Sequence, residues 1–312
     1  MIQIVKDTRP WFFLQTTHST YGMRVMETGH LEHLYYGERI TVDTQDSAFC
    51  APLVIQRGFA PGNTCTYDRE HPQISMEDVC LEVGTCGKGD IREPFLEVCF
   101  TDGSVTSDFT FVSFEVLTLK DRDERMQASG LPHSYSEEES SSAKCLHIIL
   151  QDATNRLELQ LFYTVYEDCD VITRSACLLN RSDTFVTIER CMSAQLDLTE
   201  DYSDTGTSSN RANPFVILSP ENTCETSGSC IGCNLIYSGN NYEAHEKDSY
   251  GKFRFVAGIN PRSFSWQLAP GEVFYTPEAV LNFSADGFRG LSGQLHSFIR
   301  EHIVRGVWKH KP

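Results

Sequence analysis

The sequence predicts an all-β sandwich, because apolar and polar residues alternate along many short segments and polar turns separate those segments. The alternation is clearest at 157–163, where every second residue is apolar or aromatic: Leu157, Leu159, Leu161 and Tyr163. A period of two is typical of a strand with one buried face. Many such strands at short spacing favour a sandwich or barrel over alternating strands and helices.

Further strands are expected at 144–150, 170–180, 184–198 and 251–258, where similar patterns recur. Turns are expected at 151–155 and 180–183, which are rich in Asp and Asn. Residues 134–142 contain three adjacent glutamates, Glu137, Glu138 and Glu139, among serines. This stretch is too polar to be buried, so we expect a solvated loop rather than a catalytic or calcium-binding cluster.

The last part of the chain shows a helical pattern instead. Apolar residues recur there at helical spacing: Leu291, Leu295, Phe298, Ile299 and Ile303. Gly306 is expected to stop this helix. The predicted organisation is a β-sandwich domain at 1–290 and an amphipathic helix with a linker at 291–312.

The charge balance argues against a nucleic-acid partner. The chain has 43 acidic and 26 basic residues, a formal net charge of −17, and no stripe of Lys and Arg for binding phosphates. No apolar run approaches the roughly 18 residues that suggest a membrane helix. The N-terminal residues lack a basic start followed by an apolar signal stretch. We therefore expect a soluble, cytoplasmic protein without membrane or nucleic-acid partners.

The twelve cysteines are scattered, and several lie in apolar segments. Buried thiols pack as small hydrophobic groups, and a chain of this length needs no disulfide framework, so we expect most to be reduced and to lie in strands. Cys224, Cys230 and Cys233 form the one cluster. It lacks a fourth ligand at a zinc-site spacing, and no metal is predicted there.

The sequence contains no complete catalytic motif. Gly290 to Gln294 resembles a nucleophile elbow but has its second glycine out of register. Gly84 to Gly89 lacks the Lys-Ser/Thr ending of a phosphate-binding loop, and no cofactor is expected. His30 and His33 would point to opposite faces of an extended strand, so we expect them at the surface. The sequence therefore predicts no catalytic residue and no metal ligand.

One short stretch, Gly87-Lys88-Gly89-Asp90-Ile91-Arg92-Glu93-Pro94, combines backbone and charge signals. The two glycines allow unusual backbone angles, and the proline stiffens the exit. Asp90 and Arg92 would lie on one side of an extended backbone, at an exposed, rigid turn. Such a pair suits sugar hydroxyls or a subunit interface. The alternative is a β-bulge that the ion pair merely stabilises.

This stretch resembles the G-x-G-D-[FY]-R-E-P signature in the N-terminal domain of family 36 glycoside hydrolases, the microbial α-galactosidases. Further similar motifs follow in the family's order: Leu31-Glu32-His33-Leu34-Tyr35-Tyr36-Gly37, Tyr237-Ser238-Gly239-Asn240, Gly258-Ile259-Asn260-Pro261 and Phe274-Tyr275-Thr276-Pro277-Glu278. The matching motifs extend from Leu31 to Trp308.

The resemblance implies a β-supersandwich of the galactose-mutarotase-like type that precedes a (β/α)₈ barrel. In the family, both catalytic aspartates lie on the barrel, as nucleophile and acid/base of a retaining mechanism. This chain contains no counterpart of the barrel. Loops of the N-terminal domain reach a neighbouring subunit's active site in oligomeric members. By that resemblance, Asp90 and Arg92 are candidates for the substrate rim or the interface.

The sequence departs from the family pattern at three places. Cys86 replaces an aromatic residue before the first glycine of the signature, and Asn210 replaces a histidine in G-x-S-S-H. The family usually has a further segment, about as long as a β-hairpin and carrying a W-x-R-E motif, after the strand that corresponds to 193–198. This chain reads S-A-Q-L-D-L at 193–198 and lacks that segment. Either this segment was lost or the chain is a divergent branch of the family.

The resemblance predicts a non-catalytic domain of an α-galactosidase that acts on α-galactosides such as melibiose and raffinose. Its partners would be the barrel of the same parent chain and further copies in a homo-oligomer, with galactoside contacted indirectly at most. The alternative is a stand-alone sandwich that binds carbohydrate through aromatic platforms or serves only in oligomerisation.

Overall fold

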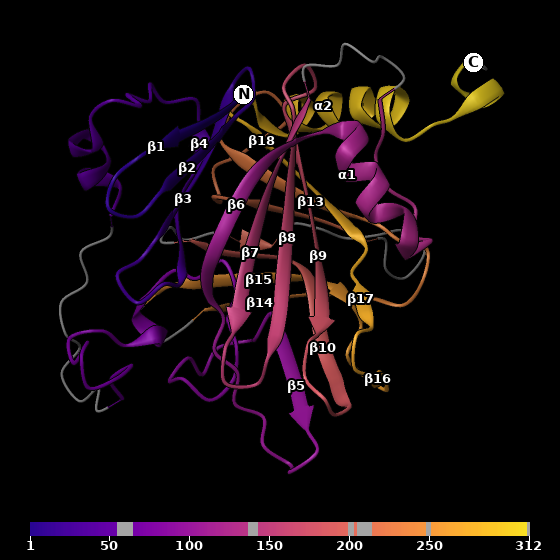
Figure 1. Cartoon of the computed structure of the whole chain (residues 1–312). Coiled ribbons are helices and arrows are strands. Elements are labelled where there is room, and N and C mark those ends of the chain that lie inside the picture. Colours follow the sequence, from indigo (N-terminus) through magenta and orange to yellow (C-terminus); the bar gives the residue numbers. More distant parts are fainter. Residues whose placement is uncertain (55–64, 137–142, 199–202, 205–213, 248–250, 311–312) are drawn as a thin grey trace.

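The computed structural model describes residues 1–54, 65–136, 143–198, 203–204, 214–247 and 251–310 (Figure 1). Within these residues the strands form three antiparallel sheets. The predicted loop glutamates Glu137, Glu138 and Glu139, and Asn210, lie outside the described residues.

The largest sheet crosses the front of Figure 1 with β6 to β9. Its order in the described residues is β11-β12-β13-β18-β9-β8-β7-β6, and β17 also pairs with β9. The strands are β6 (Thr110–Thr118), β7 (Lys144–Asp152), β8 (Leu157–Tyr166), β9 (Val171–Asn180), β11 (Ser203–Asp204), β12 (Phe215–Ser219), β13 (Cys230–Ile236), β17 (Val273–Tyr275) and β18 (Glu278–Ser284).

The second sheet lies behind β6 to β9 in the view, and the third lies at its upper left. The second sheet contains β5 (Leu96–Phe100), β10 (Val186–Leu198), β14 (Asn241–Lys247), β15 (Phe253–Ile259) and β16 (Trp266–Leu268). The third contains β1 (Ile2–Val5), β2 (Trp11–Gln15), β3 (Ser19–Val25) and β4 (Leu31–Glu38).

One hydrophobic cluster joins the three sheets. Phe12 of β2, Leu159 of β8 and Leu196 of β10 all belong to it, and none of them is exposed. The sheets bury their apolar faces against one another, so the fold is the expected supersandwich. The five strands predicted from alternation correspond to β7, β8, β9, β10 and β15.

The predicted C-terminal helix is present as α2 (Gly287–His302), which lies across the top of Figure 1 and contacts β13 and β18. Leu291 and Phe298 are buried, whereas Ile299 faces outward. The helix ends at His302, before Gly306. The next residue, Ile303, has φ −120° and ψ −48°, and this φ lies outside the helical range. Gly306 instead begins a short 3₁₀ helix, so the expected stop signal was wrong.

The remaining helical segments are short: α1 (Leu119–Met126), η1 (Ser47–Leu53), η2 (Met76–Asp78), η3 (Gln127–Ser129) and η4 (Gly306–His310). Across the described part of the chain, no helix has the length and apolarity needed to cross a membrane.

All twelve cysteines are free thiols, as expected. Eight of them are buried. Six lie in strands and six lie outside them, so the expectation that most would lie in strands was wrong. Burial raises the pKa of several thiols, including Cys145 to about 11 and Cys177 to about 12, so these groups pack as neutral side chains.

Candidate functional site

The stretch from 87 to 94, called here the 87–94 turn, precedes β5 and has the unusual backbone angles that its glycines predict. Gly87 has φ 92° and Gly89 has φ 89°. A Cβ atom at Gly87 would collide with Thr106, and one at Gly89 would lie 2.9 Å from Cys65 Sγ. Glycine is therefore required at both positions on conformational and steric grounds.

Asp90 and Arg92 lie on the same side of the turn and form the expected ion pair. Arg92 Nε donates to Asp90 Oδ1 at 2.8 Å, and the Arg92 backbone amide donates to the same oxygen at 3.2 Å. However, the expectation of an exposed pair is wrong: the two side chains are only 2% and 4% exposed. The charges can be buried because further groups compensate them.

Asp197 and Arg254 complete a buried network of four charges with Asp90 and Arg92. Asp197 on β10 and Arg254 on β15 are direct cross-strand partners and make a bidentate pair at 2.7 and 2.6 Å. Arg254 Nη1 lies 2.8 Å from Asp90 Oδ2, and Arg92 Nη1 lies 3.2 Å from Asp197 Oδ2. Two carboxylates and two guanidinium groups alternate, so the network has no net charge.

Backbone groups satisfy the remaining donors and acceptors of the network. Arg92 Nη2 donates to the carbonyls of Met76 and Val79 at 3.0 and 2.8 Å, and the Leu81 amide donates to Asp197 at 2.9 Å. Burial favours neutral Asp197, but the two arginines outweigh it and hold the pKa of that carboxyl below its usual range. Asp197 therefore stays ionised, and the ion pairs of the network fasten the turn to β10 and β15.

Between the two buried charged residues, Ile91 points outward and is 83% exposed. Flanking residues also anchor the turn: Lys88 pairs with Asp108 at 3.0 Å, and Glu93 pairs with Arg190 of β10. The turn thus presents one large apolar side chain on a backbone that ion pairs fix on both sides.

Sequence reasoning missed Asp197 and Arg254, although a signal for each was present. Arg254 interrupts an otherwise apolar strand, and Asp197 stands between two leucines; a charge in such a position is rarely buried unless it is paired. The expectation that His30 and His33 lie at the surface was also wrong. His33 Nδ1 lies 2.9 Å from Glu82, His30 Nε2 lies 2.9 Å from Asp108, and both rings are buried.

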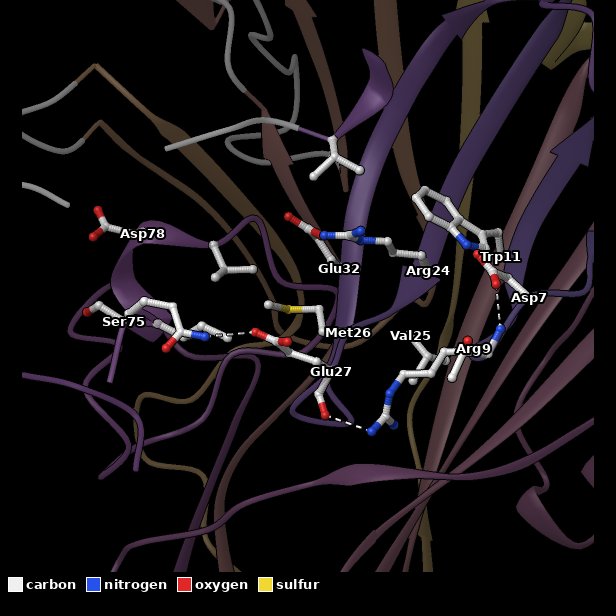
Figure 2. Close-up of a pocket in the computed structure, with 15 residues that line it drawn as sticks. Asp7, Arg9, Trp11, Arg24, Val25, Met26, Glu27, Glu32, Ser75 and Asp78 are labelled. Atoms are coloured by element: carbon white, nitrogen blue, oxygen red, sulfur yellow. Dashed lines mark hydrogen bonds and ion pairs between the residues drawn. The ribbon is translucent and has the colours of Figure 1, made fainter. Parts of the chain in front are cut away.

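A pocket of about 520 Å³ opens beside β2 and β3 (Figure 2). It is lined by several charged residues: Asp7, Arg9, Arg24, Glu27, Glu32 and Asp78. Arg24 pairs with Glu32 at 2.6 Å and covers the Trp11 ring at 5.0 Å, while Trp11 is only 9% exposed. The indole face is therefore occupied by a guanidinium group and offers no free platform for stacking a sugar.

The sequence and the fold match one family over most of the chain. The sequence model of the "Glycosyl hydrolase family 36 N-terminal domain" matches residues 29–204 and 199–269. The chain is 34% identical to the bifunctional alpha-galactosidase/sucrose kinase AgaSK of Mediterraneibacter gnavus over 99% of its own length and 35% of that protein. It is 32% identical to alpha-galactosidase AgaA of Geobacillus stearothermophilus, over 96% of the chain and 43% of AgaA.

Solved structures agree with this match. The alpha-galactosidase from Lactobacillus brevis superimposes with a TM-score of 0.89 at 31% identity, covering 98% of this chain and 44% of that one. Alpha-galactosidase AgaB from Geobacillus stearothermophilus gives a TM-score of 0.85 at 28% identity, covering 100% and 44%. The chain thus spans less than half the length of these relatives.

The family match divides at 199–204, directly after β10, which is where the motifs predicted a missing segment. The alignment with AgaSK runs over 341 residues, more than the 312 of this chain, so AgaSK carries residues that this chain lacks. With the motifs, the supersandwich and the match in agreement, the chain belongs to the glycosyl hydrolase family 36 N-terminal domain family.

Proposed function

We propose that this chain forms the non-catalytic N-terminal domain of an α-galactosidase acting on α-galactosides such as melibiose and raffinose. In that protein the 87–94 turn would contribute to assembly and to the rim of the active site. Residues 291–312 would connect the sandwich to a catalytic (β/α)₈ barrel. The relatives support the proposal because each is an α-galactosidase of more than twice this length.

The exposure of Ile91 is the observation that carries the proposed role of the 87–94 turn. An isoleucine that is 83% exposed gains nothing for the folding of this chain, yet four buried charges hold its backbone in place. A fixed, protruding apolar residue is suited to insertion into a complementary surface, where rigidity lowers the entropy lost on binding. Asp90 and Arg92 thus become supports of the contact residue rather than direct contacts.

The test replaces Ile91 with aspartate in the longer protein that the proposal requires. Placing a charge at an interface should lower kcat/KM for an aryl α-galactoside by about tenfold, or shift the oligomer to smaller species, while the melting temperature stays unchanged. The matched control is Val112→Asp, because Val112 of β6 is 52% exposed and lies away from the turn in sequence.

Two outcomes would contradict the proposal. An Ile91→Asp enzyme with full activity and an unchanged oligomer would remove the turn from the interface. A reading frame that stops after Pro312 in the native gene would remove the catalytic partner, and the chain would then be a stand-alone sandwich.

A further inference from the structure

Three side chains that bind transition metals meet where α2 ends. Asp168 and Cys169 occupy the turn between β8 and β9, and His302 is the last residue of α2. A carboxylate oxygen, the cysteine sulfur and an imidazole nitrogen all lie within 4.8 Å of one another. The turn and the helix are far apart in sequence, so folding alone brings these groups together.

The orientation of His302 points one ring nitrogen into this cluster. Its Nδ1 lies 2.8 Å from the backbone carbonyl of Tyr135, which can only accept, so Nδ1 carries the proton. Nε2 is buried and has no hydrogen-bond partner within the described residues, and it lies 3.6 Å from Asp168 Oδ2. An imidazole that donates from one nitrogen to a backbone carbonyl is typical of a metal-bound histidine.

The surroundings hold the histidine rigidly. The Tyr135 amide donates to the His302 carbonyl at 3.0 Å, and the Tyr166 ring lies 4.4 Å from the imidazole. The His302 side chain is only 8% exposed. A buried acceptor without a donor is costly to the fold, and a cation bound at Nε2 would remove this cost.

We propose that Asp168, Cys169 and His302 bind a zinc ion that fastens the C-terminus of α2 to the β8–β9 turn. Thiolate and imidazole ligands select zinc over magnesium or calcium, and three protein ligands leave the fourth tetrahedral position for water. The thiolate and the carboxylate balance the two charges of the ion. This inference is independent of the proposed function.

Small movements complete the coordination. Zinc lies about 2.0–2.3 Å from its ligands, so the ligand atoms must approach to about 3.5 Å from one another. Asp168 can move because its side chain is 63% exposed, whereas His302 and Cys169 are held by packing. Zinc binding displaces the proton of the Cys169 thiol into solvent.

The test measures zinc binding by the 312-residue chain after chelator treatment, in competition with a chromophoric chelator. We expect one equivalent of Zn²⁺ to bind and to raise the melting temperature. Cobalt should give a thiolate-to-metal charge-transfer band in the near ultraviolet. Cys169→Ser and His302→Gln should each weaken binding by more than about 100-fold and abolish the added thermal stability.

Matched controls separate this cluster from other cysteines and histidines. Cys224→Ser changes an exposed thiol of the only cysteine cluster noted in the sequence, and His296→Gln changes an exposed histidine on the same helix. Both should bind zinc as the unchanged chain does. If Cys169→Ser or His302→Gln fails to fold, Asp168→Asn still tests the site, because the Asp168 side chain is exposed.

The proposal is overturned if the chain binds no stoichiometric zinc, because His302 and Asp168 would then form an ion pair only. It is also overturned if folded Cys169→Ser or Asp168→Asn keeps the zinc affinity and the cobalt band of the unchanged chain. Loss of zinc affinity and of the cobalt band in Cys224→Ser would overturn it as well.

Discussion

Neighbouring residues of the 87–94 turn have opposite environments. Asp90 and Arg92 are buried, while Ile91 between them is 83% exposed. This inverts the usual distribution, in which charged residues face water and isoleucine is buried. The inversion is stable because Asp197 and Arg254 neutralise both charges. Asp90 and Arg92 could be recognised in the sequence as a pair, but their burial depends on partners about 100 residues or more away.

The burial of Asp90 makes its replacement costly. Asp90→Ala would leave the guanidinium groups of Arg92 and Arg254 without one of their two carboxylates, so the free energy of unfolding should fall by about 3–5 kcal/mol. Urea denaturation of the 312-residue chain measures this change. Asp183→Ala is the control, because Asp183 is 85% exposed in its pair with Arg156 and should contribute less than about 1 kcal/mol. A loss at Asp90 no larger than at Asp183 would show that the network is not a structural support.

Asp108 should make stability depend on acid pH. Burial alone would raise its pKa, but His30 and Lys88 lower it to about 2 from 3.8. A carboxyl whose pKa is lower in the folded state stabilises the fold above its unfolded pKa. Its contribution of about 2 kcal/mol should be complete above about 3.8 and lost as the pH falls to about 2.

The measurement compares the urea midpoint of the unchanged chain with that of Asp108→Asn across this pH range. The difference in unfolding free energy should shrink towards zero as the pH falls, because the protonated carboxyl then resembles the amide. Asp183→Asn should show little such dependence, since its ion pair is exposed. A difference that stays constant with pH would contradict the assigned cause.

At the scale of elements, the alternation in 157–163 predicted β8, where Glu158 and Gln160 are partly exposed between buried residues. Apolar segments also predicted β9 and β15, although nearly all of their residues are buried. The helix α2 was also predictable, because Leu291 and Phe298 both face the sheet. Its end was not, because Ile303 leaves the helix without a glycine signal. The zinc-binding cluster was invisible in the sequence, since it depends on the contact between this helix end and the β8–β9 turn.

Phe298 should be the residue that fixes α2 to the large sheet. It is fully buried and its ring packs against Tyr166 at 5.1 Å. Phe298→Ala should lower the free energy of unfolding by about 3–5 kcal/mol, because it leaves a cavity between the helix and the sheet. Ile299→Ala is the control on the same helix, since Ile299 is 38% exposed and should cost much less. Thermal or urea denaturation distinguishes the two, and equal losses would contradict this packing.

At the scale of the whole molecule, collinear motifs predicted the family and the fold better than any single residue did. Each motif is short, but their order from Leu31 onward agrees with the family match at 29–204 and 199–269. The candidate site was only partly predictable. The need for the glycines and the ion pair could be predicted from local chemistry. The exposed residue of the turn is Ile91 rather than the charged pair, and no charge pattern could indicate this. The β10–β15 register that pairs Asp197 with Arg254 is a long-range property of the fold.

Whether the chain can catalyse also depends on the whole molecule, because catalysis requires carboxyl groups in the right places. Retaining glycoside hydrolysis needs two carboxyl groups about 5–5.5 Å apart on either side of the scissile bond, one of them a nucleophile. The carboxylates of the 87–94 turn cannot serve, because Asp90 and Asp197 are buried and each is paired with two arginines. We therefore expect the purified 312-residue chain to release no nitrophenol from an aryl α-galactoside. A preparation of Asp90→Ala, made in the same host, controls for contaminating host enzyme. Release that exceeds this control and persists through purification would contradict the proposal that catalysis resides in a separate barrel.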